Sequence, residues 1–230
     1  MDFPLKTANQ FHLLDQKKQK LGGGKSNLEI CIQDHLIPHS LNVAPSSQHL
    51  PYFTDSANKI SNHQVNRMFS FLLKLSGKIE ELNEQDLLEL HHHLTLNSPV
   101  GYRDTNSQPV ISDHIPLAPA NIASAIERFF EWVRSPSFSE MHPIQQMTLS
   151  QIRLWEIYPF SHYCQVTISI FSSYFLTAQL FLPPLYPINQ LPDFHNALKK
   201  AFLFSTQPLI DLNIEACHRS YDFVLEKEKI

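Results

Sequence analysis

The sequence predicts an all-helical fold, and three observations support this prediction. The stretch from Val166 to Leu182 is apolar on nearly every face of a helix, and a helix that is apolar all round belongs inside a core. Elsewhere, apolar residues recur at helical spacing. Only five glycines occur in 230 residues, which argues against a β sandwich or barrel with many turns. We therefore expect one principal domain around a central helix over residues 165–182.

The other helices are predicted from apolar stripes and end signals. Ser61 or Asn62 suits the start of one helix and Gly77 its end, while Asn83 suits the cap of the next. Pro136 follows a helix over residues 121–134, and Pro143 suits the first turn of another. The side chains expected in the core are Val65, Met68, Phe69, Leu72, Leu75, Leu87, Leu90, Leu94, Ile122, Ile126, Phe129, Val133, Ile210, Ile214, Cys217, Tyr221 and Val224. Residues 38–59, 95–119 and 183–192 are rich in proline without a helical period and are predicted loops.

Two local patterns have structural interpretations. Ser26-Asn27-Leu28-Glu29 follows a run of glycines and has the pattern of a capping box, in which the Ser26 hydroxyl and the Glu29 carboxylate satisfy free amides at a helix start. His91, His92 and His93 are consecutive in a predicted helix, so they point about 100° apart and do not share a metal ion. We expect these histidines at the surface or at the edge of the core, and we expect no metal site.

Composition excludes several classes of protein. The formal net charge of -4 gives no electrostatic reason to expect nucleic acid as a partner. Cys31, Cys164 and Cys217 have no disulfide spacing, and the start Met-Asp-Phe-Pro is unlike a signal peptide, so we expect reduced thiols in the cytoplasm. No charged residue lies between Glu156 and Asp193, but prolines interrupt that run. A buried core helix is favoured over a membrane span.

The stretch before the central helix resembles the signature of the Fic (Fic/Doc) family, which reads H-P-F-x-D/E-G-N-G-R. Here it stands as Tyr158-Pro159-Phe160-Ser161-His162-Tyr163-Cys164-Gln165-Val166, so Pro159 and Phe160 remain. The resemblance implies a Fic-like helical domain. In that family the His is the general base, the acid holds Mg²⁺, the glycine turn cradles phosphates and the Arg binds them. The resemblance therefore implies the scaffold without its usual transfer of AMP from ATP to a protein hydroxyl.

Two further stretches resemble parts of the same family. Ser26 to Ile30 is similar to an inhibitory-helix motif, S-x-I-E-G, which implies that Ser26 and Glu29 are regulatory and that residues 26–36 pack near residues 158–166. Gly101-Tyr102-Arg103 resembles the signature before the family's target-binding flap, a β-hairpin, and Val110-Ile111 resembles its apolar centre. We therefore expect an N-terminal extension at residues 1–60 and a Fic-like domain at residues 61–230, with the flap at residues 100–119.

Two functional hypotheses follow. In the first, the chain is an inactive relative that serves as an interaction or regulatory module, without a cofactor and with another protein as partner; homo-oligomer formation stays open. Tyr158, with an ordinary pKa of about 10, is unsuited to act as base, and Tyr163 and Gln165 add bulk where phosphates would approach. In the second hypothesis, His162, Cys164 or Ser161 supports transfer from ATP with Mg²⁺ or from another phosphate donor.

Overall fold

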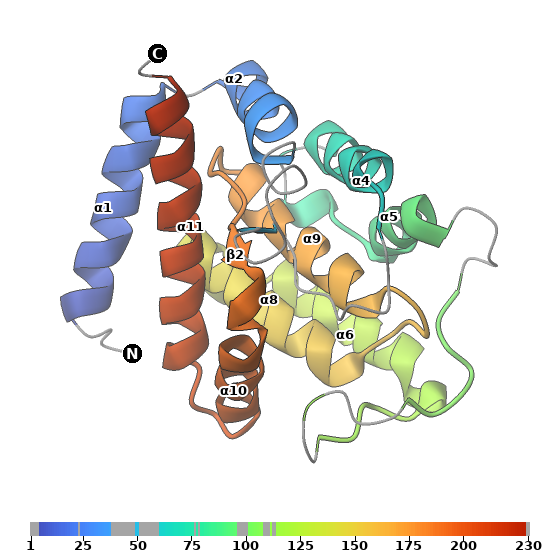
Figure 1. The fold of residues 1–230 in the computed structure, drawn as a ribbon. Helices are drawn as coiled ribbons and strands as arrows, with labels where there is room; N and C mark the ends of the chain where they lie inside the picture. Colours follow the sequence, from blue (N-terminus) through green and yellow to red (C-terminus); the bar gives the residue numbers. More distant parts are fainter. Residues whose placement is uncertain are drawn as a thin grey trace.

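A computed structural model describes residues 5–22, 24–37, 49–50, 60–75, 77, 79–95, 101–107, 111 and 114–228 (Figure 1). In these ranges the chain forms a bundle of helices, and its sheet consists of one pair of two-residue strands. The all-helical class predicted from the sequence is confirmed.

Helix α9 (Cys164–Thr177) lies in the middle of the bundle, and every one of its residues is buried. Helices α8 (Pro143–Ile157), α4 (Asn62–Lys74) and α5 (Glu84–Thr95) pack against it. The central helix is thus confirmed, but its predicted end at Leu182 is wrong. The helix stops because Leu180 turns left-handed (φ 62°) and the N–H of Phe181 donates to the carbonyl of Leu176 at 2.9 Å, as in a Schellman turn. After a turn at residues 178–180, the apolar run continues over residues 181–185 as a buried segment that is not helical.

The predicted apolar stripes face the core, with Leu75 half-buried and the others buried. They lie on α4, α5, α6 (Ile122–Val133) and α11 (Gln207–Lys227). The caps are also as predicted. The Ser61 hydroxyl accepts from the N–H of Gln64, and the Asn83 side chain accepts from the N–H of Gln85 at 2.9 Å. Residues 136–139 form the short helix α7 (Pro136–Ser139).

The N-terminal segments lie against the bundle. Helix α1 (Leu5–Leu21) runs beside α11, and its Phe11 ring stacks on His142 at the start of α8, with ring centroids 4.0 Å apart (Figure 1). Helix α2 (Lys25–Ile30) continues into the π-helical segment η1 (Cys31–Leu36), which also packs on α11. The chain is therefore helical over residues 26–36, as predicted. The domain boundary at residue 60 stays a prediction.

The predicted capping box at Ser26 is wrong. Gly24 is extended (φ -125°, ψ 161°), so α2 begins at Lys25 and Ser26 already lies inside the helix. No side chain caps this end. Instead, the Asn27 amide donates to the carbonyls of Leu21 (2.9 Å) and Gly22 (2.8 Å), which fixes the turn between α1 and α2.

The predicted loops contain short ordered elements. Strand β1 (His49–Leu50) pairs antiparallel with β2 (Tyr186–Pro187), so two predicted loops are joined by hydrogen bonding between backbones far apart in sequence. The loop predicted at residues 183–192 ends early, because α10 (Leu191–Phe202) places Pro192 in its first turn, where its missing N–H costs nothing. Single turns occur at η3 (Ile79–Glu81), η4 (Pro119–Asn121) and η5 (Ile188–Gln190).

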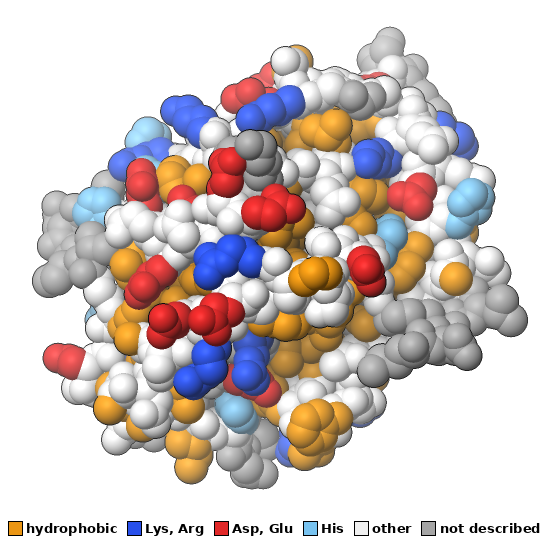
Figure 2. Space-filling view, turned by 180° about the vertical axis from the view of Figure 1, so that it is seen from behind, with side chains coloured by type: hydrophobic (Ala, Val, Ile, Leu, Met, Phe, Trp, Pro, Cys, Tyr) orange, Lys and Arg blue, Asp and Glu red, His pale blue; other side chains and the backbone are white. Residues whose placement is uncertain are grey.

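Charged side chains of both signs are mixed on one face of the molecule (Figure 2). On the face in Figure 2, acidic and basic side chains are interspersed rather than gathered by sign. Among the described helices none is both long and apolar enough to cross a membrane. The uncharged run after Glu156 instead supplies α9 and the buried segment that follows it.

The turn after α10 holds a strained, exposed aromatic residue. Phe204 is left-handed (φ 65°) and 97% exposed. Its N–H donates to the carbonyl of Ala201 and that of Ser205 to the carbonyl of Lys200, both at 2.9 Å, which forms a Schellman turn. Glycine occupies this position without strain, whereas other residues pay for it.

We predict that Phe204→Gly raises the free energy of unfolding by roughly 0.5–1 kcal/mol, because it relieves strain and removes no buried contact. Urea unfolding measures the change. Leu203→Gly is the matched control, since Leu203 is also exposed but has φ -98°, and it should lower stability. Destabilisation by Phe204→Gly would show that the turn is not strained.

Candidate functional site before helix α9

The loop between α8 and α9 is held by two left-handed residues. Tyr158 ends α8 with φ 48°, and its N–H donates to the carbonyl of Leu154 at 2.8 Å. Tyr163 has φ 52° and directly precedes α9. Neither residue is glycine, so each conformation costs about 1–2 kcal/mol and persists because the surroundings impose it. Between them, Pro159 and Phe160 are buried while Ser161 and His162 are exposed.

Arg103 holds much of the backbone of this loop in place through hydrogen bonds. Its Nε donates to the carbonyl of Tyr158 at 2.7 Å, and its backbone N–H donates to the carbonyl of Pro159 at 2.9 Å. The remaining guanidinium groups donate to backbone carbonyls of Thr105, Leu117 and Ile157. The side chain is 5% exposed. The Arg103 guanidinium therefore donates its hydrogen bonds to backbone carbonyls of the protein itself. These bonds connect residues 101–107 to the loop.

His91 supports the loop from α5. Its ring stacks on Phe160, with centroids 3.7 Å apart and planes 6° apart, and its Nδ1 lies 2.9 Å from the Thr167 hydroxyl. That hydroxyl donates to the carbonyl of Tyr163 at 3.0 Å, so His91 acts as the donor to it. Burial lowers the pKa of His91 to about 4, which keeps the ring neutral at pH 7.

The expectation that His91 lies at the surface or the core edge is wrong. His91 follows Leu87 by one helical turn and precedes Leu94 by three residues, so it belongs to the buried stripe of α5. That spacing was the signal in the sequence for its burial. No cluster of three or more His, Cys, Asp or Glu side chains suited to a metal ion occurs in the part of the chain that the structure describes.

The flap residues are only partly brought to the loop. Tyr102 lies against Phe160, with ring centroids 5.8 Å apart, and its hydroxyl donates to Glu84 at 2.8 Å. Burial and this carboxylate raise the pKa of Tyr102, so it stays protonated. Gly101 is exposed and Val110 lies outside the described residues. In the described part of the flap, Ile111 and His114 form an isolated antiparallel bridge, in which the N–H of His114 donates to the carbonyl of Ile111 at 3.0 Å, and the β-hairpin stays a prediction.

The first turn of α9 faces the core. Cys164, Gln165 and Val166 are all buried, and Val166 is 0% exposed. Burial raises the pKa of the Cys164 thiol more than the Phe160 N–H and the Arg103 charge lower it, so the thiol is protonated at neutral pH. The open face of the loop thus offers a hydroxyl, an imidazole and part of a phenol from residues 161–163.

The segment with Ser26 and Glu29 lies over α4. Both residues are exposed, and the Glu29 carboxylate accepts from Gln33 at 3.3 Å, whose amide also reaches Ser70 of α4 at 3.2 Å. Lys25, at the start of α2, shares a cavity with Thr177 at the far end of α9 from the loop. A regulatory role for Ser26 and Glu29 and their packing near residues 158–166 stay predictions.

We predict that Arg103→Met lowers the free energy of unfolding by about 3 kcal/mol, because it removes the guanidinium donor from buried carbonyls at residues 157 and 158 and from a partly buried one at residue 117. Chemical denaturation measures the loss. Arg153→Met is the control, since Arg153 is exposed and pairs with Glu156 within its own helix at 2.8 Å, and it should change stability by less than about 0.5 kcal/mol. Equal effects of the two substitutions would contradict the proposed clamp.

We also predict that stability falls as pH drops from 6.5 to 4. His91 takes up a proton near pH 6.5 in the unfolded chain but only near pH 4 in the folded one, so the folded state loses stability across this window. His91→Gln should reduce the slope by up to about 1.4 kcal/mol per pH unit. Denaturant unfolding at several pH values measures the slope, and an unchanged slope in His91→Gln would refute the assignment.

Comparisons with known proteins show which family this region resembles. Residues 81–176, which run from before α5 to within α9, match the model of the Fic/DOC family. "Protein adenylyltransferase Fic" of Drosophila ananassae is 25% identical over 147 residues, and that of Drosophila melanogaster is 24% identical. The match covers 63% of this chain and 30% of each of these relatives.

Solved structures share the fold. Fic-1 from C. elegans superposes with a TM-score of 0.69 at 16% identity, over 96% of this chain and 71% of that one. A Fic-domain signaling protein from Bacteroides thetaiotaomicron gives a TM-score of 0.71 at 12% identity, over 96% and 98% of the two chains. The family model thus identifies a Fic/DOC domain at residues 81–176, and the solved Fic structures share the fold of the chain around it.

Proposed function

We propose that this chain is a Fic-fold interaction or regulatory module that does not transfer AMP. The observation that carries the proposal is the burial of Val166, which stands where the family motif has its phosphate-binding arginine. A valine buried in the core offers no charge to a nucleotide. Arg103, the cation beside the loop, does not replace it, because its donors are bonded to backbone carbonyls.

The other motif positions support the same proposal. Tyr158 replaces the histidine base, and a phenol, whose ordinary pKa is about 10, is by type a poor base at neutral pH. Tyr163 keeps the left-handed backbone that glycine would adopt, but adds a ring where phosphates would lie against backbone amides. His162 stands at the metal-binding position as a single exposed imidazole. Base, metal ligand, phosphate turn and cation are thus replaced together.

The alternative, a transferase that uses altered residues, has less support. Cys164 is the strongest nucleophile in the loop by type, but it is buried and its thiol stays protonated. Ser161 and His162 are exposed and adjacent, yet adjacent loop residues with no positioned cation do not make a phosphate site. ATP and Mg²⁺ would be the cofactors of this alternative.

An apolar surface next to the flap supports binding to another protein. Ile115 is 75% exposed, Leu203 is 73% exposed and Phe204 is 97% exposed. The two segments meet where the His114 ring stacks on Phe202, with centroids 4.0 Å apart. Exposed apolar residues that flank a contact between two segments are typical of an interaction site, and Phe204 is kept there despite its strained backbone.

We predict that the unaltered chain adds no AMP to itself or to proteins of a lysate when incubated with labelled ATP and Mg²⁺, because phosphate recognition needs preorganised amides and a positive charge. Mass spectrometry reports any adenylyl group, and calorimetry should detect no tight ATP binding. Tyr158→His alone should restore nothing.

The control for this assay is a chain in which residues 158–166 carry the complete family motif. It shows whether the scaffold supports transfer once all the replaced groups return together. ATP-dependent modification by the unaltered chain, lost in His162→Ala or Cys164→Ser, would overturn the proposal in favour of the transferase.

A further inference from the structure

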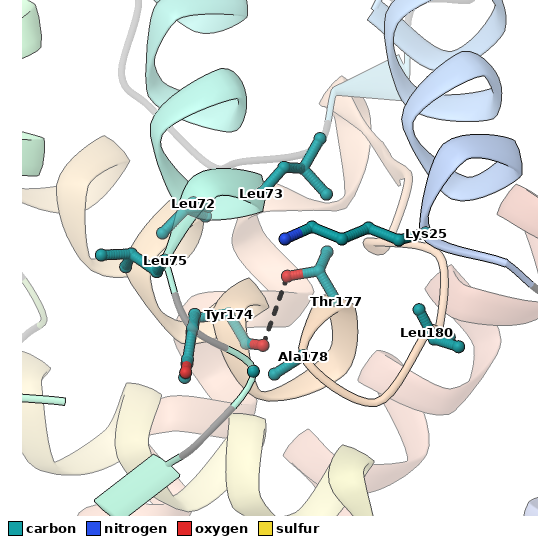
Figure 3. A pocket seen from close by; sticks show the side chains of 9 residues that line it. Lys25, Leu72, Leu73, Leu75, Tyr174, Thr177, Ala178 and Leu180 are labelled. Atoms are coloured by element: carbon teal, nitrogen blue, oxygen red, sulfur yellow. Dashed lines mark hydrogen bonds between the residues drawn. The ribbon is translucent and has the colours of Figure 1, made fainter. Parts of the chain in front are cut away.

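A small apolar cavity lies where α2, α4 and the end of α9 meet (Figure 3). Its volume is about 90 Å³. Its walls are mainly the aliphatic side chains of Leu72, Leu73 and Leu75 at the end of α4 and of Ala178 and Leu180 after α9, and Lys25 and Tyr174 also line it. The cavity is at the opposite end of α9 from the loop at residues 158–163, so an inference about it is independent of the proposed function.

Lys25 gives this cavity its charge. In Figure 3 its side chain extends across the cavity, with the ammonium group between Leu72 and Thr177. Within the described ranges, Lys25 forms no ion pair, and it is the one charged residue among those that line the cavity. An apolar hollow with a single ammonium group favours a ligand with an alkyl part and one negative charge.

A neighbouring hollow determines which way the carboxylate of such a ligand points. This second cavity, of about 260 Å³, shares Leu75 and Tyr174 with the first and carries the carboxylates of Glu81 and Asp86 beside Lys74. Burial and the negative charges of Asp86, Glu80 and Glu81 raise the pKa of Tyr174 to about 12. The field on that side is therefore negative, and a ligand carboxylate is directed toward Lys25.

Size limits the class of ligand. An apolar protein cavity of about 150 Å³ holds one benzene molecule, so a cavity of about 90 Å³ accepts an alkyl group of roughly four carbons. A nucleotide is excluded by size. We propose that this cavity binds a short branched alkyl carboxylate, with Lys25 as counter-ion, either as a free acid or as the carboxylate-bearing leucine at the end of a polypeptide.

A ligand bound in this cavity would contact both α2 and the end of α9, which are far apart in the sequence. Lys25 belongs to the first turn of α2, whereas Thr177, Ala178 and Leu180 belong to the end of α9. An occupant that contacts both would hold the start of α2 against the bundle. The segment with Ser26 and Glu29 would then respond to the ligand.

The proposal is tested by following methyl and amide NMR signals of the full chain during titration with isovalerate. From four buried carbons and one exposed ion pair we expect a Kd on the order of 1 mM, with shifts at Leu72, Ala178 and Lys25. Isovaleramide, which is neutral and of nearly the same shape, should bind about three to five times more weakly.

Two variants and a matched control separate the parts of the site. Lys25→Gln should weaken isovalerate about three- to fivefold and leave isovaleramide unchanged, because it removes only the ammonium group. Ala178→Leu should abolish both sets of shifts by filling the cavity, and its thermal unfolding checks that it folds. Lys74→Gln is the control, since Lys74 lines the other hollow, and it should leave binding unchanged.

An acetylated tripeptide ending in leucine distinguishes the two sources of the ligand. Tighter, Lys25-dependent binding of the peptide than of isovalerate would assign a polypeptide terminus, and weaker binding would assign the free acid. The proposal is overturned if isovalerate causes no shifts at about 20 mM, or if Lys25→Gln and Lys74→Gln affect its binding equally.

Discussion

Complete burial of α9 is the constraint on which the rest of the structure depends. A helix without an exposed face must satisfy its polar side chains internally. The hydroxyls of Thr167, Ser169 and Ser173 do this by donating to carbonyls one turn earlier in the chain, at 2.9–3.0 Å. The surrounding helices are therefore free to meet α9 with leucine, isoleucine and phenylalanine side chains, and one continuous core results.

The same burial decides what the loop before α9 presents to solvent. Because the first turn of α9 is in the core, Cys164 and Val166 face inward and do not contribute to an open site. Two buried side chains stabilise this arrangement. Arg103 donates hydrogen bonds to carbonyls of the loop, and His91 stacks on Phe160. The loop's backbone is thus held from two sides by buried side chains, and our proposal that this Fic-like fold serves binding rather than transfer starts from the residues that the loop leaves exposed.

The other end of α9 is shaped by the way the helix stops. The left-handed Leu180 turns the chain away from the helix axis, and the space left beside Ala178 is closed by α4 on one side and by Lys25 on the other. One buried helix therefore separates two surface features, a loop with exposed polar side chains at its start and a small cavity lined by Lys25 at its end. Ligands at the two places need not compete.

The sequence by itself determined the helices with an apolar stripe, the caps at Ser61 and Asn83, and the central place of α9, because spacing and capping are local properties of the chain. Only the tertiary structure decided the role of Arg103, whose partner Tyr158 is 55 positions away, and the pairing of His49–Leu50 with Tyr186–Pro187. It also decided where α2 begins and where α9 ends. The sequence pattern of a buried apolar run is the same whether its backbone is helical or extended, so the end of α9 could not be predicted. The partners of a hydrogen-bond donor such as Arg103 depend on which distant carbonyls the packing of the chain brings within reach.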